Sequence, residues 1–326
     1  RGVAANRIFA GLLLAISFPV LADEVVDPVV QAIRQSGGGA GRLEVCHALK
    51  KANATVTTVA EQKIKSDAVR FVAQKLKNSD ASMLRARADA ARKGLYGYRQ
   101  DSALALMLYE KAKSQEAGLN AALMRYQAAD ITVNPAVAKQ ILDTLYKSGA
   151  AKERSRGLVG SQAHYLAGLI QEGGYAGERD TKKAFLHYRA SARATYVPGI
   201  YHYLRLNIES LPKLTDAERQ SVIPEVRLMS NRWRWQSADI MMLNGDLYAA
   251  GWFPDEADGF FAQYYWRIAQ NMGGRKEIKD FDSLIQKRIK RLSKEKEERL
   301  EGAVKAAMSN VSNVPHNLEF MDLCAE

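Results

Sequence analysis

Three stretches of the chain share one spacing of residues, and this spacing restricts the fold more than any other feature. In each stretch an aspartate is followed by an alanine at +4, a large aromatic residue at +8 and a small residue at +11. At about 100° per residue these offsets lie within roughly 80° of one another, so they share one face of a helix. The three sets are Asp101, Ala105 and Tyr109; Asp180, Ala184 and Tyr188; and Asp258, Ala262 and Trp266.

The distance between the three stretches indicates a repeat. The aspartates are 79 and 78 residues apart, which is two periods of about 39 residues. A weaker unit around Asn134 fits the first gap, whereas the second gap, 199–235, fits poorly. We therefore predict about five helical hairpins between residues 81 and 274, stacked into a solenoid because one hairpin cannot bury its apolar face alone.

Each repeated position has a physical role. The aspartate or asparagine is expected at or near the helix N-cap, where its side-chain oxygen accepts an otherwise unpaired backbone N–H. The alanine lets the partner helix approach closely, and the aromatic residue fills the space between units. The sequence thus predicts structural rather than chemical roles for these residues.

The N-terminus has the pattern of a secretory signal. Arg1 and Arg7 precede an apolar run, 8–20, and small residues after it predict cleavage behind Ala22, which makes 1–22 a signal peptide. The alternative is a transmembrane anchor, but the run is shorter than the roughly 20 residues that span a bilayer. The expected location is therefore periplasmic or secreted, with no integral membrane anchor.

The charge of the chain restricts its partners. The formal net charge is +11, and loss of the two signal-peptide arginines leaves +9 on the mature chain. A basic balance makes an acidic partner plausible, such as an anionic polysaccharide or a phospholipid surface. Export from the cytoplasm argues against nucleic acid as a partner.

The regions outside the repeats are expected to be helical as well. We assign 23–80 to an N-terminal helical region and 275–326 to a C-terminal capping helix and tail. One long charged helix is predicted over 281–308, because apolar residues form a stripe along it. A solvated capping helix is the favoured interpretation, and a coiled-coil or partner-binding helix is the alternative.

The chain has two cysteines, Cys46 and Cys324. In an oxidising compartment two lone cysteines pair more often than not, which would tie the N-terminal region to the tail. Two buried or unpaired thiols are the alternative. Neither cysteine has the spacing to histidine or a second cysteine that is typical of a metal site.

The repeat resembles a known family. The stretches YGYRQDSALALMLYEKA and GYAGERDTKKAFLHYRASA, together with 251–274, are similar to the Sel-one-like repeat, a tetratricopeptide-related helical hairpin. The resemblance implies an all-α, right-handed solenoid that acts as a scaffold, since exported bacterial members are implicated in assembling envelope machinery. The fourth unit departs from the pattern at +4, and the Leu-Gly pair survives only as Ala167-Gly168 and Asn244-Gly245. A branch linked to penicillin hydrolysis has a disulfide within each repeat, which this chain lacks.

Residues that could carry chemistry are few. His164 and His187 fall in facing helices of one hairpin, but a packed structural role is favoured because no carboxylate or cysteine shares their spacing. Asp255, Glu256 and Asp258 cluster in one turn, where capping is favoured over a catalytic pair or a cation site. The remaining histidines, at 47, 202 and 316, and the serines at 161 and 191 match no catalytic motif. We expect no catalytic residue, cofactor or metal.

The most suggestive local feature is a run of alternating arginine and tryptophan. Arg232, Trp233, Arg234 and Trp235 could stack on sugar rings or contact an anionic polymer. In a helix, however, the two tryptophans lie about 200° apart, so they cannot share a face. The favoured interpretation is that one tryptophan is core and the arginines cover its edges.

These observations predict a periplasmic scaffold whose concave face binds another protein of the cell envelope. Solenoids present broad concave surfaces, which suit protein partners better than small substrates. The alternative is direct binding of an anionic cell-wall or exopolysaccharide glycan through basic and aromatic residues. An enzyme acting on the cell wall is a third hypothesis, disfavoured because no catalytic constellation is present in the sequence.

Overall fold

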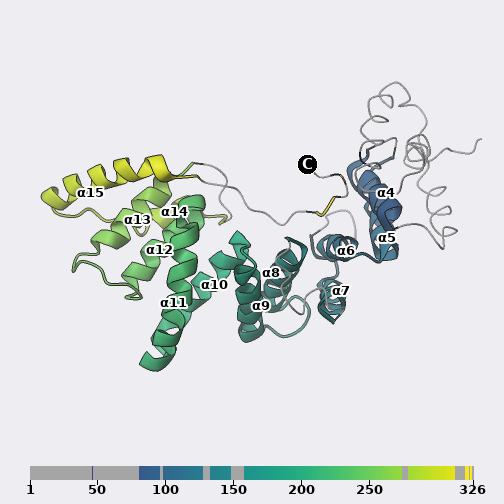
Figure 1. The fold of residues 1–326 in the computed structure, drawn as a ribbon, viewed down its shortest axis with the longest axis horizontal. Helices are drawn as coiled ribbons and strands as arrows, with labels where there is room; N and C mark the ends of the chain where they lie inside the picture. The colour runs from purple at the N-terminus through teal and green to yellow at the C-terminus, as the bar shows by residue number, and fades with distance from the viewer. Residues whose placement is uncertain are drawn as a thin grey trace, which may run out of the picture.

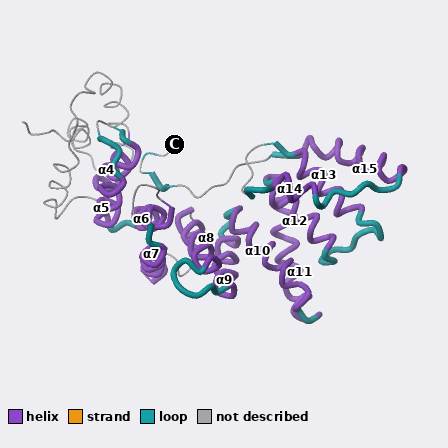
Figure 2. The backbone as a smooth tube through the Cα atoms, turned by 180° about the vertical axis from the view of Figure 1, so that it is seen from behind, coloured by secondary structure: helices purple, strands orange, loops and turns teal. Residues whose placement is uncertain are grey.

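The structure is a computed structural model, and every regular element in the part of the chain it describes is a helix (Figure 2). The signal peptide predicted for 1–22 lies outside the described residues, as does all of the predicted region 23–80 except Cys46. The described residues are 46, 81–95, 98–127, 133–147, 158–273, 278–312, 320–322 and 324.

The helices pack in consecutive pairs, and the pairs follow one another along an elongated, curved array (Figure 1). This is the all-α solenoid that the repeat predicts. The pairs are α4 (Ala81–Lys93) with α5 (Ser102–Ala112), α6 (Gln115–Gln127) with α7 (Pro135–Lys147), α8 (Leu158–Gly173) with α9 (Thr181–Arg193), α10 (Val197–Ser210) with α11 (Asp216–Trp233), and α12 (Ala238–Ala249) with α13 (Phe260–Asn271).

Side-chain caps begin the second helix of the first three pairs. Asp101 Oδ1 accepts the backbone N–H of Leu104 at 2.8 Å, and Asp180 Oδ1 accepts that of Lys183 at 2.9 Å. Asn134 caps α7 in the same way at 3.1 Å. Each side chain thus satisfies one of the N–H groups that the first helical turn leaves without a partner.

The residues at +4 and +8 form the contacts between paired helices. The aromatic rings at +8 lie on the glycine of the partner helix: a Cβ atom at Gly168 would be 2.5 Å from Tyr188 Cε1, and one at Gly245 would be 2.5 Å from Trp266 Cδ1. A side chain at either glycine would therefore separate the helices. The buried residues at these positions are Ala105, Tyr109, Ala184, Tyr188, Ala262 and Trp266.

The fifth pair departs from the expected cap. Asp255, rather than Asp258, is the main cap of α13 and accepts the backbone N–H groups of Phe261 and Ala262 at 2.8 and 3.0 Å. The residue directly before α13 is a glycine with φ of 75°, and this left-handed turn brings the earlier carboxylate to the helix end. The Asp258 carboxylate instead pairs with Lys296.

The fourth pair, whose repeat pattern is weak, is less closely packed than the others, because α10 lies mainly against α9 of the preceding pair. Thr215 caps α11 through a capping box, in which its hydroxyl accepts the N–H of Glu218 and the Glu218 carboxylate accepts the N–H of Thr215. A 3-10 turn, Leu211–Lys213, joins α10 to this cap. Local capping chemistry thus replaces the aspartate of the other units.

The prediction of one long helix over 281–308 is wrong. The chain forms α14 (Phe281–Gln286), an irregular stretch, and α15 (Lys294–Ala307), followed by a 3-10 turn, Met308–Asn310. Gln263 of α13 donates to the carbonyl of Arg288 at 3.0 Å and accepts the N–H of Lys290 at 2.9 Å. Arg267 also donates to the Lys290 carbonyl. Because α13 side chains take these backbone hydrogen bonds, the helix cannot continue through them.

Candidate functional site

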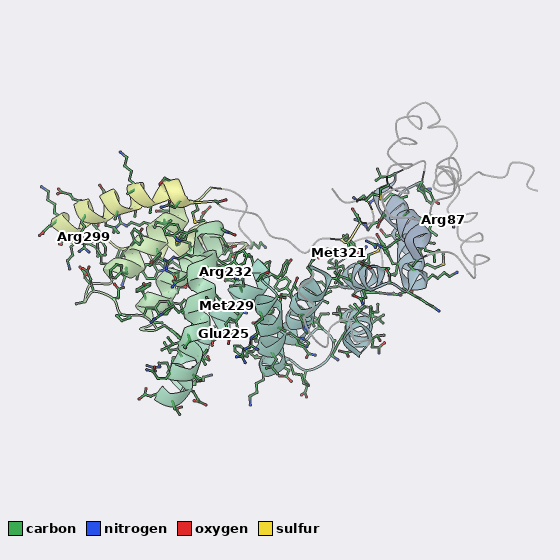
Figure 3. All side chains as sticks on the ribbon, in the orientation of Figure 1. Arg87, Glu225, Met229, Arg232, Arg299 and Met321 are labelled. Carbon is green, nitrogen blue, oxygen red and sulfur yellow. A yellow bond between two sulfur atoms is a disulfide. The ribbon has the colours of Figure 1, made fainter. Side chains whose placement is uncertain are left out.

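The last described residues return to the opposite end of the array from α15. We call residues 320–322 and 324 the C-terminal segment. Figure 3 labels Met321 beside α6. Hydrogen bonds from α4 and α6 hold this segment, so the first two helix pairs bind a piece of chain from about 200 residues away.

Two side chains hold the main chain of Met321. The Asn120 amide accepts the Met321 N–H at 2.6 Å and donates to the Met321 carbonyl at 3.2 Å. Arg85 Nη2 donates to the same carbonyl at 2.7 Å. An amide side chain carries one acceptor and two donors, so Asn120 pairs with the segment much as a second peptide group would. These hydrogen bonds are made to the backbone and do not depend on which side chain residue 321 carries.

The residues on either side of Met321 are recognised through their side chains. The Asp322 carboxylate pairs with Arg92 and Lys93 at the end of α4. The guanidinium carbon of Arg92 also lies 4.0 Å from the centroid of the Phe320 ring, in cation–π geometry. The site therefore contacts an aromatic ring and a carboxylate on either side of a residue that it holds by its backbone and packs against the core. We call Arg85, Arg92, Lys93 and Asn120 the segment-binding site.

The repeat explains why Asn120 is available. It lies 14 residues before Asn134, as Arg87 lies 14 before Asp101 and Asn244 lies 14 before Asp258. All three side chains are buried. In the third unit Ala167 stands directly before Gly168, as Asn244 stands before Gly245. Sequence reasoning did not identify this site, but a buried amide at an otherwise apolar repeat position was its available signal.

A disulfide joins the segment to the N-terminal region. Cys46 and Cys324 are bonded, with their Cα atoms 5.3 Å apart and 278 residues between them in sequence. Both half-buried cysteines pack against the core cluster of α4 and α5. The bond closes two residues after Asp322, so it holds the segment close to the helices that bind it.

The histidines of the central pairs are packed. His164 Nδ1 and His187 Nδ1 are 3.2 Å apart, and burial lowers the pKa of His164 to about 4 and that of His187 in the same direction. His202 stacks on Tyr188 with ring centroids 4.6 Å apart. Burial, and then the Arg205 charge, lower the pKa of His202 to about 3. At neutral pH these imidazoles are uncharged. His47 and His316 lie outside the described residues.

The arginine–tryptophan run is divided between two parts of the core. α11 ends at Trp233, and a 3-10 turn, Arg234–Gln236, follows. Trp233 packs against the cluster of α9 to α12, whereas Trp235 packs against that of α12 to α15. Arg232 is exposed beside the Trp233 ring (Figure 3). The two tryptophans therefore do not form one platform.

The other candidate residues are also engaged in structural contacts. The Glu256 and Asp258 carboxylates pair with Arg299 and Lys296 of α15. Ser191 Oγ donates to the Ser161 carbonyl at 2.7 Å. Within the described part of the chain, no three metal-ligating side chains are placed to hold an ion. None of the described helices combines the length and apolar character needed to cross a bilayer.

Comparison with known proteins shows which solved structures have a similar fold. No protein-family model matches the sequence, and no curated protein matches it. Among solved structures, the chain is similar to a Sel1 repeat protein from Oxalobacter formigenes, with a TM-score of 0.50 and 16% identity over 78% of this chain and 98% of that chain. It also matches a protective antigen of uropathogenic Escherichia coli strains with an SLR fold, at a TM-score of 0.41 and 11% identity over 87% of this chain and 68% of that one. The molecule is thus a helical-repeat solenoid, and its fold is that of a Sel1 repeat protein.

Proposed function

We propose that this protein is an exported scaffold that binds another protein of the cell envelope on its concave side. The observation that carries the proposal is the segment-binding site. There, α4 and α6 hold a short non-helical piece of protein through its backbone and two flanking side chains. Main-chain hydrogen bonds supply affinity and flanking side chains supply specificity in many peptide-binding proteins. The proposed role is binding rather than catalysis.

Export is part of the proposal. The predicted signal peptide, 1–22, directs the chain to an oxidising compartment, where a disulfide such as Cys46–Cys324 persists. These two features together support a periplasmic location. It would give an envelope scaffold access to its partners.

Crosslinking in cells tests the scaffold role. A photo-reactive residue in place of Glu116, which pairs with Arg85 at the edge of the segment-binding site, should give one crosslinked product of discrete mass. The same residue in place of Leu228, exposed on α11, is the matched control and should give none. Mass spectrometry of the product identifies the partner. Absence of any product from both positions, or identical products from both, would contradict a scaffold with a defined binding face.

Binding of an anionic glycan is the second candidate, since Arg232 is exposed beside Trp233. Its contacts would be electrostatic, so affinity should fall steeply between low and high salt. Pull-down on peptidoglycan or exopolysaccharide should then be lost in an Arg232→Ala, Arg234→Ala variant. Retention by that variant at high salt would remove this candidate.

A further inference from the structure

We propose that the segment-binding site is a peptide site which the chain's own C-terminal segment occupies while the Cys46–Cys324 disulfide is closed. When the disulfide is reduced, the site accepts a segment of another protein with an aromatic residue, a central apolar residue, and an acidic residue. This inference rests on the proposed scaffold function and names the chemistry of one partner. The partly buried Phe320 and Met321 side chains show that the site also offers an apolar surface to its ligand.

The contacts themselves argue for an exchangeable ligand. Asn120 and Arg85 bind the carbonyl of Met321, and Asn120 also binds its N–H, while the methionine side chain packs against the apolar cluster of α6 to α8, so another apolar residue could replace it. Arg92 and Lys93 require an acidic group, and Arg92 also offers its guanidinium face to an aromatic ring. A linear peptide of this pattern can satisfy every one of these contacts without the rest of the C-terminal region.

The covalent bond explains why the segment stays bound. A ligand held by so few contacts binds weakly from solution, but a short tether gives it an effective concentration in the millimolar range. A partner at micromolar concentration cannot compete with the tethered segment. Once the disulfide opens, the segment is joined to the site only through the chain that leads from α15 at the other end of the array, so its effective concentration falls and the fraction of unoccupied site rises.

Opening of the site is a thiol–disulfide exchange with a dithiol. One thiolate of the dithiol attacks a sulfur of the Cys46–Cys324 bond and forms a mixed disulfide, which releases the other cysteine as a thiol. The second thiol of the dithiol then displaces the remaining cysteine. The chain ends with two thiols, and the dithiol ends as its own disulfide. Two electrons have passed from the dithiol to the chain.

The occupant is a different protein rather than a second copy. A second copy whose segment entered this site would bring its Cys324 to the Cys46 of its neighbour, and reoxidation would leave the two cysteines bonded across two chains. A non-reducing gel detects this as a covalent dimer, and such a dimer as the main species would overturn the proposal.

The direct test measures peptide binding to the full-length chain. The probe is a fluorescein-labelled peptide of residues 317–326 with serine in place of Cys324, read by fluorescence anisotropy before and after dithiothreitol. We expect the reduced chain to bind at least tenfold more tightly than the oxidised chain. An Asp322→Lys peptide should lose most of this binding. Equal affinity of the oxidised and reduced chains, or equal affinity of the two peptides, would overturn the proposal.

Variants of the site separate recognition from folding. Asn120→Ala should weaken peptide binding to the reduced chain at least tenfold, whereas Asn244→Ala should leave it unchanged. Asn244 is the matched control because it is buried at the same repeat position and bonds Ser230 instead of the segment.

Variants at Lys93 test recognition of the peptide even if Asn120→Ala fails to fold. Its side chain is largely exposed and contacts Asp322, so Lys93→Gln should fold normally and reduce affinity several-fold. Lys93→Arg should restore the affinity. Equal peptide affinity of the Lys93→Gln and Lys93→Arg variants would overturn the recognition of Asp322 by charge. A partner crosslinked in cells at Glu116 together with absent peptide binding would overturn this inference and leave the scaffold proposal standing.

Discussion

The two ends of the array are covered by neighbouring parts of the same C-terminal region, in two different ways. At one end α15 lies on α13 and buries Leu300, Val304 and Ala307, and an ion pair between Arg267 and Glu297 adds to the contact. At the other end residues 320–322 lie on α4 and α6 and are held by hydrogen bonds, ion pairs and a disulfide, with Phe320 and Met321 only partly buried against the core. We call the first the packed end and the second the tied end.

This difference has an energetic consequence. Burial of a large apolar side chain contributes about 1.5 to 3 kcal/mol and requires no further linkage. An intramolecular hydrogen bond contributes only about 1 kcal/mol net, and an ordered segment loses conformational entropy of similar size. Because the Phe320 and Met321 side chains are only partly buried, the tied end relies more on its covalent bond than the packed end, whose apolar side chains are buried. The predictions below test that contrast.

The largest effect is expected at the tied end. Replacement of both cysteines, Cys46→Ser with Cys324→Ser, should lower the free energy of unfolding by about 3 to 5 kcal/mol, because the disulfide closes a very long loop in the unfolded chain. Denaturant titration measures this loss. Hydrogen exchange should show faster exchange in α4 to α6 and unchanged exchange in α12 to α15. Uniform acceleration along the whole array would contradict an effect local to the tied end.

At the packed end, Leu300→Ala should cost about 2 to 4 kcal/mol, since the side chain is fully buried and its loss leaves a cavity. Faster hydrogen exchange should appear in α13 to α15 and be absent from α4 to α6. Leu300→Met keeps most of the volume and is the control, with a cost below about 1.5 kcal/mol. A similar cost for both variants would argue against cavity formation.

The packed histidines predict that acid weakens the middle of the array before either end. Burial holds the folded pKa of His164 near 4 and of His202 near 3, below the unfolded value of about 6.5. As pH falls from 7 toward 4 the unfolded chain therefore binds protons first, and stability is lost. We expect a loss on the order of 2 kcal/mol for each histidine, measured by urea titration at pH 7 and pH 4.5.

Glutamine variants isolate this effect from the titration of carboxylates. His164→Gln and His202→Gln remove the titrating group and keep a polar side chain of similar size. Each should flatten the dependence of stability on pH between 7 and 4.5. An unchanged dependence in both variants would place the acid sensitivity elsewhere in the chain.

The smallest effect separates two aspartates at the packed end. Asp255→Ala should cost about 1 kcal/mol through loss of the α13 cap. Asp258→Ala removes a partly exposed ion pair with Lys296 and should cost no more than about 0.5 kcal/mol. Thermal unfolding of the two variants under identical conditions makes the comparison. The reverse order would return the capping role to Asp258.

Much of the fold could be predicted from local pattern. The offsets of the repeat identify a helical hairpin, because they depend only on helix geometry and on the volume of side chains at a contact. Prediction from these offsets failed where contacts with residues distant in the sequence determined the local structure. Residues 287–293 have a helical pattern, yet Gln263 and Arg267 of α13 bind their backbone and interrupt the helix. At Asp258, a glycine turn moved the cap to Asp255.

The candidate site could be predicted only in fragments. Cys46 and Cys324 were possible partners from the count of cysteines and the expected compartment, but their spacing alone does not bring them together. Asn120 and Met321 are about 200 residues apart, and no periodicity relates them. A buried amide in a repeat indicates that a partner exists, but it does not indicate which segment supplies it.

By itself, therefore, the sequence determined the unit of construction. Caps, close alanine contacts and aromatic wedges act between residues a few turns apart, so their pattern is visible along the chain. Only the tertiary structure decided how the two ends are covered. A backbone-directed contact leaves no pattern in the segment that it binds, because the hydrogen-bonding groups of Met321 are those of every peptide unit.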